Sequence, residues 1–203
     1  MNTKERITHE ALKLFSQNGY NGTSVKQIAD AVGIKDASLY KHFKSKQEIF
    51  EFIVEKSIKS FSSRMGKFGV DFAQNKDDRA AFFKISHEEQ VDVMQRLFLH
   101  TLGDKSPALF RKMMTVEQFK QPRLAELYNQ RYVDAQYDAF EALMQDGINM
   151  GVYKPGNARA MAMQYISPII LLVGVCDRDP ERKEESLKLI ADHIRQFDRN
   201  YRN

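Results

Sequence analysis

The stretch SVKQIADAVGIKDASLYKHF, residues 24–43, carries the clearest structural signal in the chain. Its first part, about 24–32, places three apolar residues on one helical face: Ile28, Ala29 and Val32. Gly33 then ends the helix, because glycine readily adopts the left-handed conformation of a tight turn. A second helix over about 35–43 would bury Leu39 and Phe43 on one face. This spacing predicts two helices that cross closely at a small residue, which is a helix-turn-helix.

The second helix of the pair carries a positive surface. Four cations face one acid over residues 35–46, a net charge of +3; these residues are Lys35, Lys41, Lys44, Lys46 and Asp36. Hydrogen-bond donors that can reach phosphate alternate with them: Ser38, Tyr40 and His42. A basic helix of this kind suits insertion into the major groove of DNA. The alternative is that the two helices form only a packing motif.

The longer stretch over residues 3–54 resembles the TetR family of bacterial transcriptional regulators. The matching pieces, in order, are ALKLF-x₃-GY, TSV-x₂-IA-x₂-VGI, SLYKHF and KSK-x-EIF. The resemblance implies an all-α protein of about nine or ten helices. A three-helix DNA-binding domain with a helix-turn-helix would be followed by a helical domain for ligand binding and dimerisation. It also implies a homodimer that binds a palindromic double-stranded operator and responds to a small molecule.

Family resemblance assigns roles to individual positions. Thr23 and Lys26 would touch the DNA backbone, although Thr23 could equally be only a helix cap. Lys46 would grip phosphate. Asp36 either caps its helix or accepts a hydrogen bond from a cytosine amino group, and we favour the cap. The full set of predicted DNA-contacting residues is Thr23, Ser24, Lys26, Lys35, Asp36, Ala37, Ser38, Tyr40, Lys41, His42 and Lys46.

The helical pattern continues on both sides of this motif. Thr3 is the expected cap of a first helix over about 4–18, and a fourth helix begins after the capping-box spacing of Ser45 and Glu48. We place the domain junction near Gly66 and Gly69, with residues 1–60 for DNA binding and 61–203 for ligand binding and dimerisation. Further helices are expected over about 80–86, 88–102, 106–119, 122–150, 157–175 and 179–201.

Composition narrows the class of protein. The 203 residues are 42% hydrophobic, so the chain can build a core. Most of the net charge of +4 lies in residues 1–60, where ten Lys and Arg face seven Asp and Glu. The single cysteine, Cys176, rules out an internal disulfide. The N-terminus has no apolar signal core, and the longest apolar run, 169–176, is far shorter than the roughly 20 residues that span a bilayer. We expect a cytoplasmic protein without a membrane partner.

Motifs for catalysis, cofactors and metals are absent from the sequence. His87-Glu88-Glu89 lacks the second histidine of a zinc-binding H-E-x-x-H helix. There is no G-x-S-x-G, no Gly-rich phosphate loop and no calcium-binding loop. We therefore expect no catalytic residues, no metal site and no cofactor.

Residues 90–170 are rich in methionine and aromatic side chains, which suits an adaptable apolar pocket or, more commonly, an ordinary core. The predicted residues for binding an apolar or aromatic ligand are Phe98, Met114, Tyr132, Tyr137, Phe140 and Tyr165. By resemblance, the helices at 157–175 and 179–201 would form the dimer interface, although they could also only complete the monomer core. The expected function is a repressor released by its ligand. The alternatives are an activator, a regulator controlled by a protein partner, or a helical enzyme or carrier that retains a DNA-binding domain.

Overall fold

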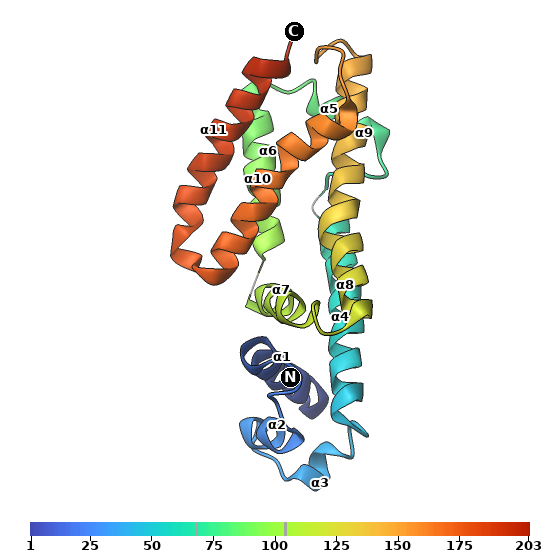
Figure 1. Cartoon of the computed structure of the whole chain (residues 1–203), viewed down its shortest axis with the longest axis vertical. Helices are drawn as coiled ribbons and strands as arrows, with labels where there is room; N and C mark the ends of the chain where they lie inside the picture. The colour runs from blue at the N-terminus through green and yellow to red at the C-terminus, as the bar shows by residue number, and fades with distance from the viewer. Residues whose placement is uncertain (68, 104) are drawn as a thin grey trace. The chain divides into compact units, whose positions relative to one another are not determined.

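The structure of the chain is a computed structural model that describes residues 1–67, 69–103 and 105–203, without the side chains of 61–67. This described part is helical, and its only β-type pairing is an isolated bridge between Tyr153 and Arg202. The elements in chain order (Figure 1) are α1 (Thr3–Asn18), α2 (Val25–Val32), α3 (Asp36–Leu39), α4 (Lys46–Lys67), α5 (Lys76–Phe82), α6 (His87–Leu102), α7 (Lys105–Glu117), α8 (Pro122–Asn129), the π-helical η1 (Gln130–Asp134), α9 (Ala135–Asn149), α10 (Ala158–Arg178), the 3-10 turn η2 (Pro180–Arg182) and α11 (Lys183–Tyr201). The predicted all-α class and the N-terminal helix-turn-helix are confirmed.

Packing divides the chain into two compact units. The first unit combines Met1–Arg64 with Gly103–Tyr128, and the second combines Met65–Leu102 with Asn129–Asn203. The first unit therefore contains α7 and most of α8, which the sequence places beyond residue 60. The division by function into residues 1–60 and 61–203 stays a prediction, because packing alone does not test where DNA and ligand bind.

The core of the first unit joins the first four helices to α7 and α8. Helix α1 contacts both α2 and α7. Phe15 is fully buried and packs edge-on against Phe50 of α4, with ring centroids 5.5 Å apart. The buried residues that α7 and α8 add to this core are Phe110, Met113, Met114 and Leu124. The apolar face of α1 is thus covered by a helix about a hundred positions further along the chain.

The core of the second unit is built mainly by α6, α9, α10 and α11. Helix α10 packs against α9 and α11, and α11 packs against α6 (Figure 1). Aromatic rings fill the space between them: Tyr165 lies edge-on to Phe197 at 4.9 Å and tilted to Phe140 at 5.7 Å. Gly147 lets two further rings approach α9, because an added Cβ would lie 2.7 Å from Tyr153 Cδ2 and 2.8 Å from Phe83 Cζ.

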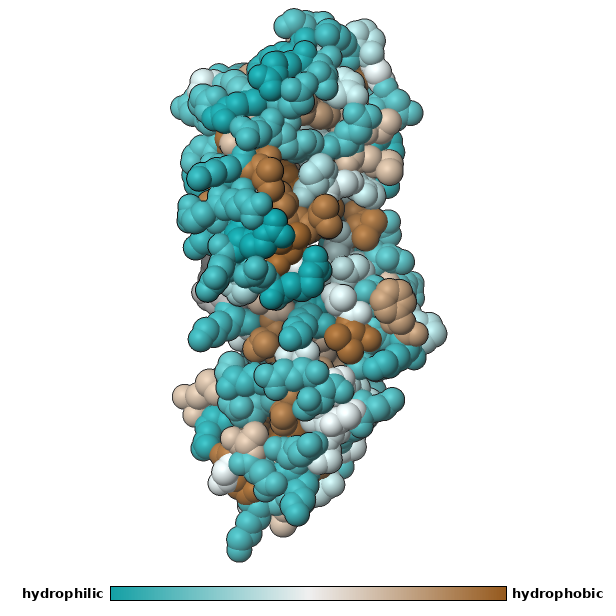
Figure 2. All heavy atoms as spheres, turned by 60° about the vertical axis from the view of Figure 1, so that its left-hand side comes forward, coloured by the Kyte–Doolittle hydropathy of each residue, from teal (hydrophilic) through white to brown (hydrophobic). Residues whose placement is uncertain are grey.

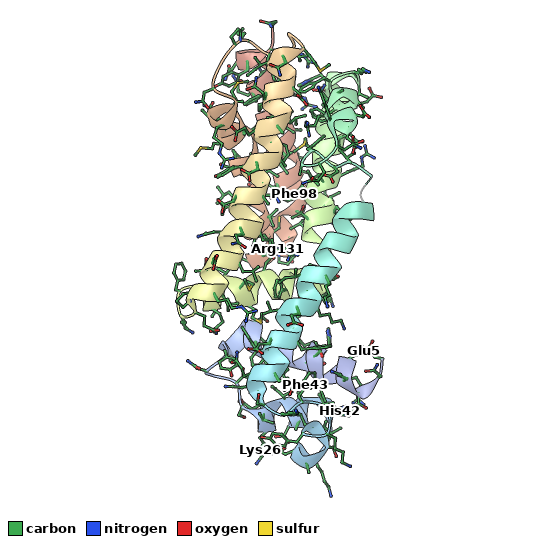
Figure 3. The ribbon with its side chains drawn as sticks, turned by 90° about the vertical axis from the view of Figure 1, so that its right-hand side faces the viewer. Glu5, Lys26, His42, Phe43, Phe98 and Arg131 are labelled. Carbon is green, nitrogen blue, oxygen red and sulfur yellow. The ribbon has the colours of Figure 1, made fainter. Side chains whose placement is uncertain are left out.

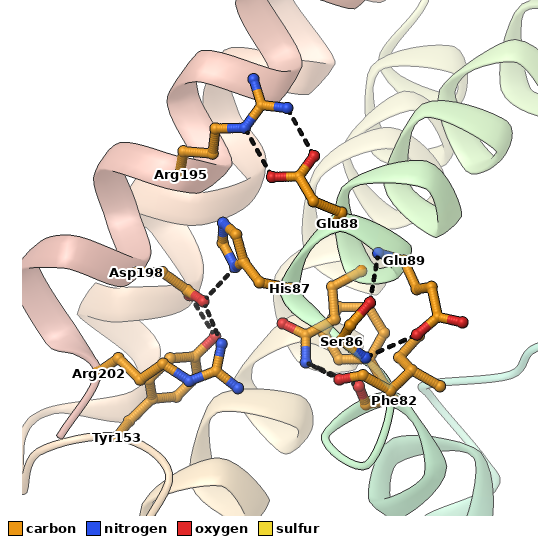
Figure 4. A network of polar contacts seen from close by, with 11 residues as sticks. Phe82, Ser86, His87, Glu88, Glu89, Tyr153, Arg195, Asp198 and Arg202 are labelled. Carbon is orange, nitrogen blue, oxygen red and sulfur yellow. Dashed lines mark hydrogen bonds and ion pairs between the residues drawn. The ribbon is translucent and has the colours of Figure 1, made fainter.

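A network of polar contacts fastens the end of α11 within the second unit (Figure 4). The buried Asp198 carboxylate accepts hydrogen bonds from the Tyr153 hydroxyl at 3.1 Å and from Arg202 Nη1 at 2.6 Å. His87 Nδ1 lies 2.7 Å from Asp198 Oδ2, a distance suited to an ion pair with a protonated imidazole, although the contact lacks hydrogen-bond geometry. Burial, and then the Asp198 charge, raise the pKa of Tyr153. The network ties α6, α11 and the loop before α10 together.

Several helix boundaries differ from the sequence predictions for local reasons. Thr3 is not the cap of α1, because Asn2 accepts the Glu5 N–H and forms the capping box with the Glu5 side chain. Helix α5 begins four residues earlier than predicted, since Asn75 caps it by accepting from the N–H groups of Asp77 and Asp78. Helix α4 continues past the predicted junction at Gly66 to Lys67.

The long helix predicted over 122–150 is interrupted. Residues Gln130–Asp134 form a π-helical turn between α8 and α9. These five residues include no proline or glycine, so the sequence does not predict the interruption. Helix α10 runs three residues past its predicted end at Val175, to Arg178. Pro168 lies inside α10, where its ring removes one helical hydrogen bond without ending the helix.

Candidate nucleic-acid interface

Helix α2 begins and ends as its sequence predicts. The Ser24 hydroxyl accepts the Gln27 N–H at 3.1 Å, and the Gln27 side chain accepts the Ser24 N–H at 2.7 Å, so the capping box is confirmed. At the other end Gly33 has φ 75° and ψ 38°, the left-handed conformation. The Ile34 N–H returns to the Ala29 carbonyl at 3.0 Å and closes the turn.

The inner faces of α2 and α3 lock the pair onto α1 and α4. Ile28, Ala29 and Leu39 are completely buried, and Phe43 is 1% exposed. Lys4 of α1 stacks over two rings of this region, with Nζ 4.9 Å from the Phe43 centroid and 4.5 Å from the Phe52 centroid. The buried side therefore fixes which side chains of the pair point outward.

Eight of the eleven predicted DNA-contacting residues are exposed on this helix pair and its flanks, two are half-buried and one is buried. Lys26 and His42 lie at the α2–α3 end of the first unit (Figure 3). Tyr40 is 52% exposed, which is unusual for so large a ring. Ser38 is half-buried. The exposed members are Ser24, Lys26, Lys35, Asp36, Ala37, Tyr40, Lys41 and His42.

Asp36 does not cap α3, contrary to the favoured reading of the sequence. The N-cap position is Lys35, whose side chain makes no cap hydrogen bond to the described residues. Asp36 is the first helical residue, where its carboxylate faces the positive end of the helix dipole. Helix α3 is also shorter than the predicted 35–43: it ends at Leu39, and the chain continues in turns closed by His42 N–H and Phe43 N–H, which both donate to the Leu39 carbonyl.

Thr23 and Lys46 are turned inward. Thr23 is 1% exposed, and its hydroxyl donates to the Gly19 carbonyl at 3.0 Å. Lys46, at the start of α4, donates from Nζ to the carbonyls of Tyr20 and Thr23, each at 2.8 Å. The same ammonium lies 4.2 Å from the Tyr20 ring centroid. Both side chains brace the loop before α2 in this structure, and their contact with phosphate remains a prediction.

A residue of α7 that the sequence gives no reason to single out also holds this loop. The Glu117 carboxylate, 1% exposed, accepts the Tyr20 N–H at 2.9 Å across 97 positions of sequence. Burial, and then the charge of Glu51, raise the pKa of the Tyr20 hydroxyl. An acid near the end of an ordinary amphipathic helix gives no local sign of such a role, because only the tertiary fold brings the two residues together.

The predicted ligand-binding residues do not form one group. Phe98, Phe140 and Tyr165 are buried in the core of the second unit. Tyr137 packs beside them, and its hydroxyl lies 3.0 Å from the Ser167 hydroxyl. Tyr132 is half-buried in η1, whereas Met114 is fully buried in the core of the first unit, apart from the others. Within the described ranges, no group of three or more His, Cys, Asp or Glu side chains is placed to hold a metal ion.

Comparison with known proteins identifies relatives of the segment that contains the helix-turn-helix. The family model described as "Bacterial regulatory proteins, tetR family" matches residues 7–53. The chain is 28% identical over 149 residues to IcaR of Staphylococcus aureus, a "Biofilm operon icaADBC HTH-type negative transcriptional regulator", covering 70% of this chain and 77% of IcaR.

Solved structures share the fold over nearly the whole chain. A TetR-family regulator from Mesorhizobium loti superposes with a TM-score of 0.65 at 16% identity, covering 99% of this chain and 97% of that one. SmeT of Stenotrophomonas maltophilia in its triclosan complex superposes with a TM-score of 0.62 at 19% identity, covering 99% and 92%. Residues 7–53 thus carry the DNA-binding segment of the TetR family of bacterial regulatory proteins, and the chain as a whole shares the fold of solved TetR-family regulators.

Proposed function

We propose that this protein is a repressor that binds a palindromic DNA operator as a homodimer in the cytoplasm and leaves it when a small molecule binds. The observation that carries the proposal is the helix-turn-helix with its inner face locked and its outer face exposed and basic. Lys26, Lys35 and Lys41 are exposed there beside Tyr40 and His42, all groups that donate to phosphate or base edges. A two-fold dimer would present two such faces to half-sites about one helical turn apart.

The surface of α10 supports pairing of two copies. By length and composition α10 is apolar enough to cross a membrane, yet only 39% of its most apolar window is buried. Met163 and Leu171 of α10 are 47% and 64% exposed, and Leu189 of α11 is 45% exposed. Figure 2 brings this side of the second unit forward and shows apolar side chains among polar ones. We assign residues 157–175 and 179–201 to a dimer interface, where a second copy would cover these side chains.

The second unit offers the chemistry for an apolar or aromatic ligand. Phe98, Phe140 and Tyr165 are aromatic side chains buried in its core, and the Tyr137 hydroxyl is a polar group packed beside them. SmeT, which shares the fold, has been solved in complex with triclosan. We propose that such a ligand favours a conformer with lower DNA affinity, which is a shift of population between two states.

The first experiment is selection of bound sequences from a random duplex pool by the purified full-length protein, repeated at two salt concentrations. Enrichment of a palindromic sequence at both salt concentrations supports the proposal. Binding that falls steeply with salt but enriches no sequence would contradict it, because phosphate contacts alone give affinity without specificity. A matched protein with Lys41→Ala should lose the enrichment, since Lys41 is exposed on the DNA-facing side and contributes nothing to the described core.

A further inference from the structure

Glu117 is a buried acid that the DNA-binding surface does not account for. It is the last residue of α7 and is 1% exposed, whereas glutamate is almost never fully buried unless it is paired. Its carboxylate makes contacts with three donors in the first unit. Oε2 accepts from Gln121 Nε2 at 3.2 Å, Oε1 lies 3.5 Å from Lys120 Nζ, and Oε1 also accepts the Tyr20 N–H at 2.9 Å.

The first two partners belong to the next turn of the same segment, but the third belongs to the loop that leads into α2. That loop is shaped to admit the carboxylate. Gly19 has φ 73°, and a Cβ at this position would lie 2.8 Å from Glu117 Oε1. Residue 19 must therefore be glycine for two reasons: its φ is positive, and the Glu117 carboxylate occupies the space that a Cβ would need.

Tyr20 is held from both sides of its backbone. Its N–H donates to Glu117 of α7, and its carbonyl accepts from Lys46 of α4. Four residues later Ser24 caps α2, so the start of the helix-turn-helix is set by these two charged side chains. Helix α7 also contacts α1 and adds apolar side chains to the shared core, namely Phe110, Met113 and Met114.

The two kinds of contact respond differently to a displacement of α7. Apolar side chains can slide past one another by about an ångström and repack, because dispersion and burial are not directional. A hydrogen bond to one backbone amide weakens steeply beyond about 3.5 Å or at poor angles. A displacement of α7 would therefore weaken the hydrogen bond to Tyr20 more than it would weaken the apolar contacts between α1 and α7.

We propose that Glu117 is a positioning residue for DNA recognition: its bond to the Tyr20 N–H sets the helix-turn-helix in the geometry that reads the operator. The inference rests on the proposed function and names a side chain outside the DNA-binding surface on which operator recognition depends.

The test compares full-length variants on the duplex selected by the wild-type protein. Glu117→Gln keeps an acceptor for the Tyr20 N–H, while Glu117→Leu removes it with little loss of side-chain volume. Gln121→Leu is the matched control, because it removes the donor to Oε2 and leaves the Tyr20 bond in place. Binding is measured by fluorescence anisotropy against the selected and a scrambled duplex, with amide hydrogen exchange at Tyr20 as the structural readout.

We expect Glu117→Leu to weaken binding to the selected duplex about tenfold, within the usual range of coupling between sites. Binding to the scrambled duplex should change less than about twofold, since the phosphate-binding lysines are untouched. Glu117→Gln and Gln121→Leu should bind the selected duplex within about threefold of wild type, which are changes below 1 kcal/mol. Tyr20 amide exchange should accelerate only in Glu117→Leu.

The proposal is overturned if Glu117→Leu exchanges its Tyr20 amide rapidly and still binds the selected duplex like wild type, or if Gln121→Leu loses as much affinity. If Glu117→Leu does not fold, an ester in place of the Tyr20 amide removes the donor alone, and wild-type affinity of that protein would overturn the proposal equally. Lys41→Ala is measured in parallel: its binding like wild type would refute the DNA-reading surface itself, whereas a loss there with unaffected Glu117 variants refutes only the positioning role.

Discussion

Replacing Lys46 by methionine tests whether this side chain stabilises the loop before α2, binds DNA phosphate, or does both. The sequence predicts that Lys46 grips DNA phosphate, whereas in the structure its ammonium braces the loop before α2 through two carbonyls at 2.8 Å. Methionine keeps the length and apolar stem of lysine but removes the charge and the donors. We expect Lys46→Met to destabilise the first unit even in the absence of DNA.

The size of the effect follows from the contacts. Hydrogen bonds from a charged group contribute roughly 1.5–3 kcal/mol each in net terms, and the cation–π contact with Tyr20 adds about 0.5–1 kcal/mol. The side chain is half-buried, so water can partly replace it at both carbonyls. We therefore expect a loss of about 2 kcal/mol in the free energy of opening, which corresponds to a roughly 30-fold rise in exchange from opened states.

Hydrogen exchange followed by mass spectrometry suits this measurement, because the chain contains no tryptophan to report on local unfolding. Peptides from α1 and α2 should exchange faster in Lys46→Met, while peptides from α10 and α11 stay unchanged. Exchange at the wild-type rate throughout would refute the bracing role. If the salt dependence of operator binding then fell by about one unit per protomer, Lys46 would be a phosphate contact.

Three further predictions concern the second unit. Leu171→Asp on α10, at a site 64% exposed, should yield monomers in sedimentation velocity with unchanged helical content; a persistent dimer would contradict the assigned interface. Gly147→Ala should lower the free energy of unfolding by about 1–3 kcal/mol, because its Cβ would lie 2.7 Å from Tyr153 and 2.8 Å from Phe83; a thermal melt equal to wild type would show that both rings can move aside. Burial and then Asp198 raise the pKa of Tyr153 above its ordinary value of 10.0, so its contribution to stability is fully present below pH 10 and is lost as the pH rises further. Absorbance of tyrosinate should therefore show this group ionising only with unfolding, and early ionisation in the folded protein would contradict its burial.

The helix-turn-helix could be predicted because its determinants are local. The Ser24–Gln27 capping box, the left-handed Gly33 and the buried positions of α2 all depend on residues within one or two turns of each other. Local reasoning predicted the wrong N-cap residue where two neighbouring residues could each begin the helix. Asn2 rather than Thr3 caps α1, and Lys35 rather than Asp36 occupies the cap position of α3, since neighbouring residues can each supply a plausible start.

What could not be predicted depends on distant contacts. Met114 looks like a pocket residue among other methionines, but α7 carries it into the core of the first unit. Glu117 looks like a solvated acid, and its partner lies 97 positions away. The inward turn of Lys46 is equally invisible, because the carbonyls it binds are presented by a loop 23 and 26 residues earlier. Pairings of this kind are set by the fold and leave no periodic trace in the sequence.

The way α7 completes the core of the first unit limits how evolution or an engineer can exchange parts of this regulator. A chimera that transplants only residues 1–60 would carry the apolar face of α1 without Phe110, Met113 and Met114, and Tyr20 without the acid that accepts its N–H. The exchangeable module is therefore discontinuous, since it needs residues 103–128 as well. Recombination within this lineage should be tolerated best when both segments come from the same parent.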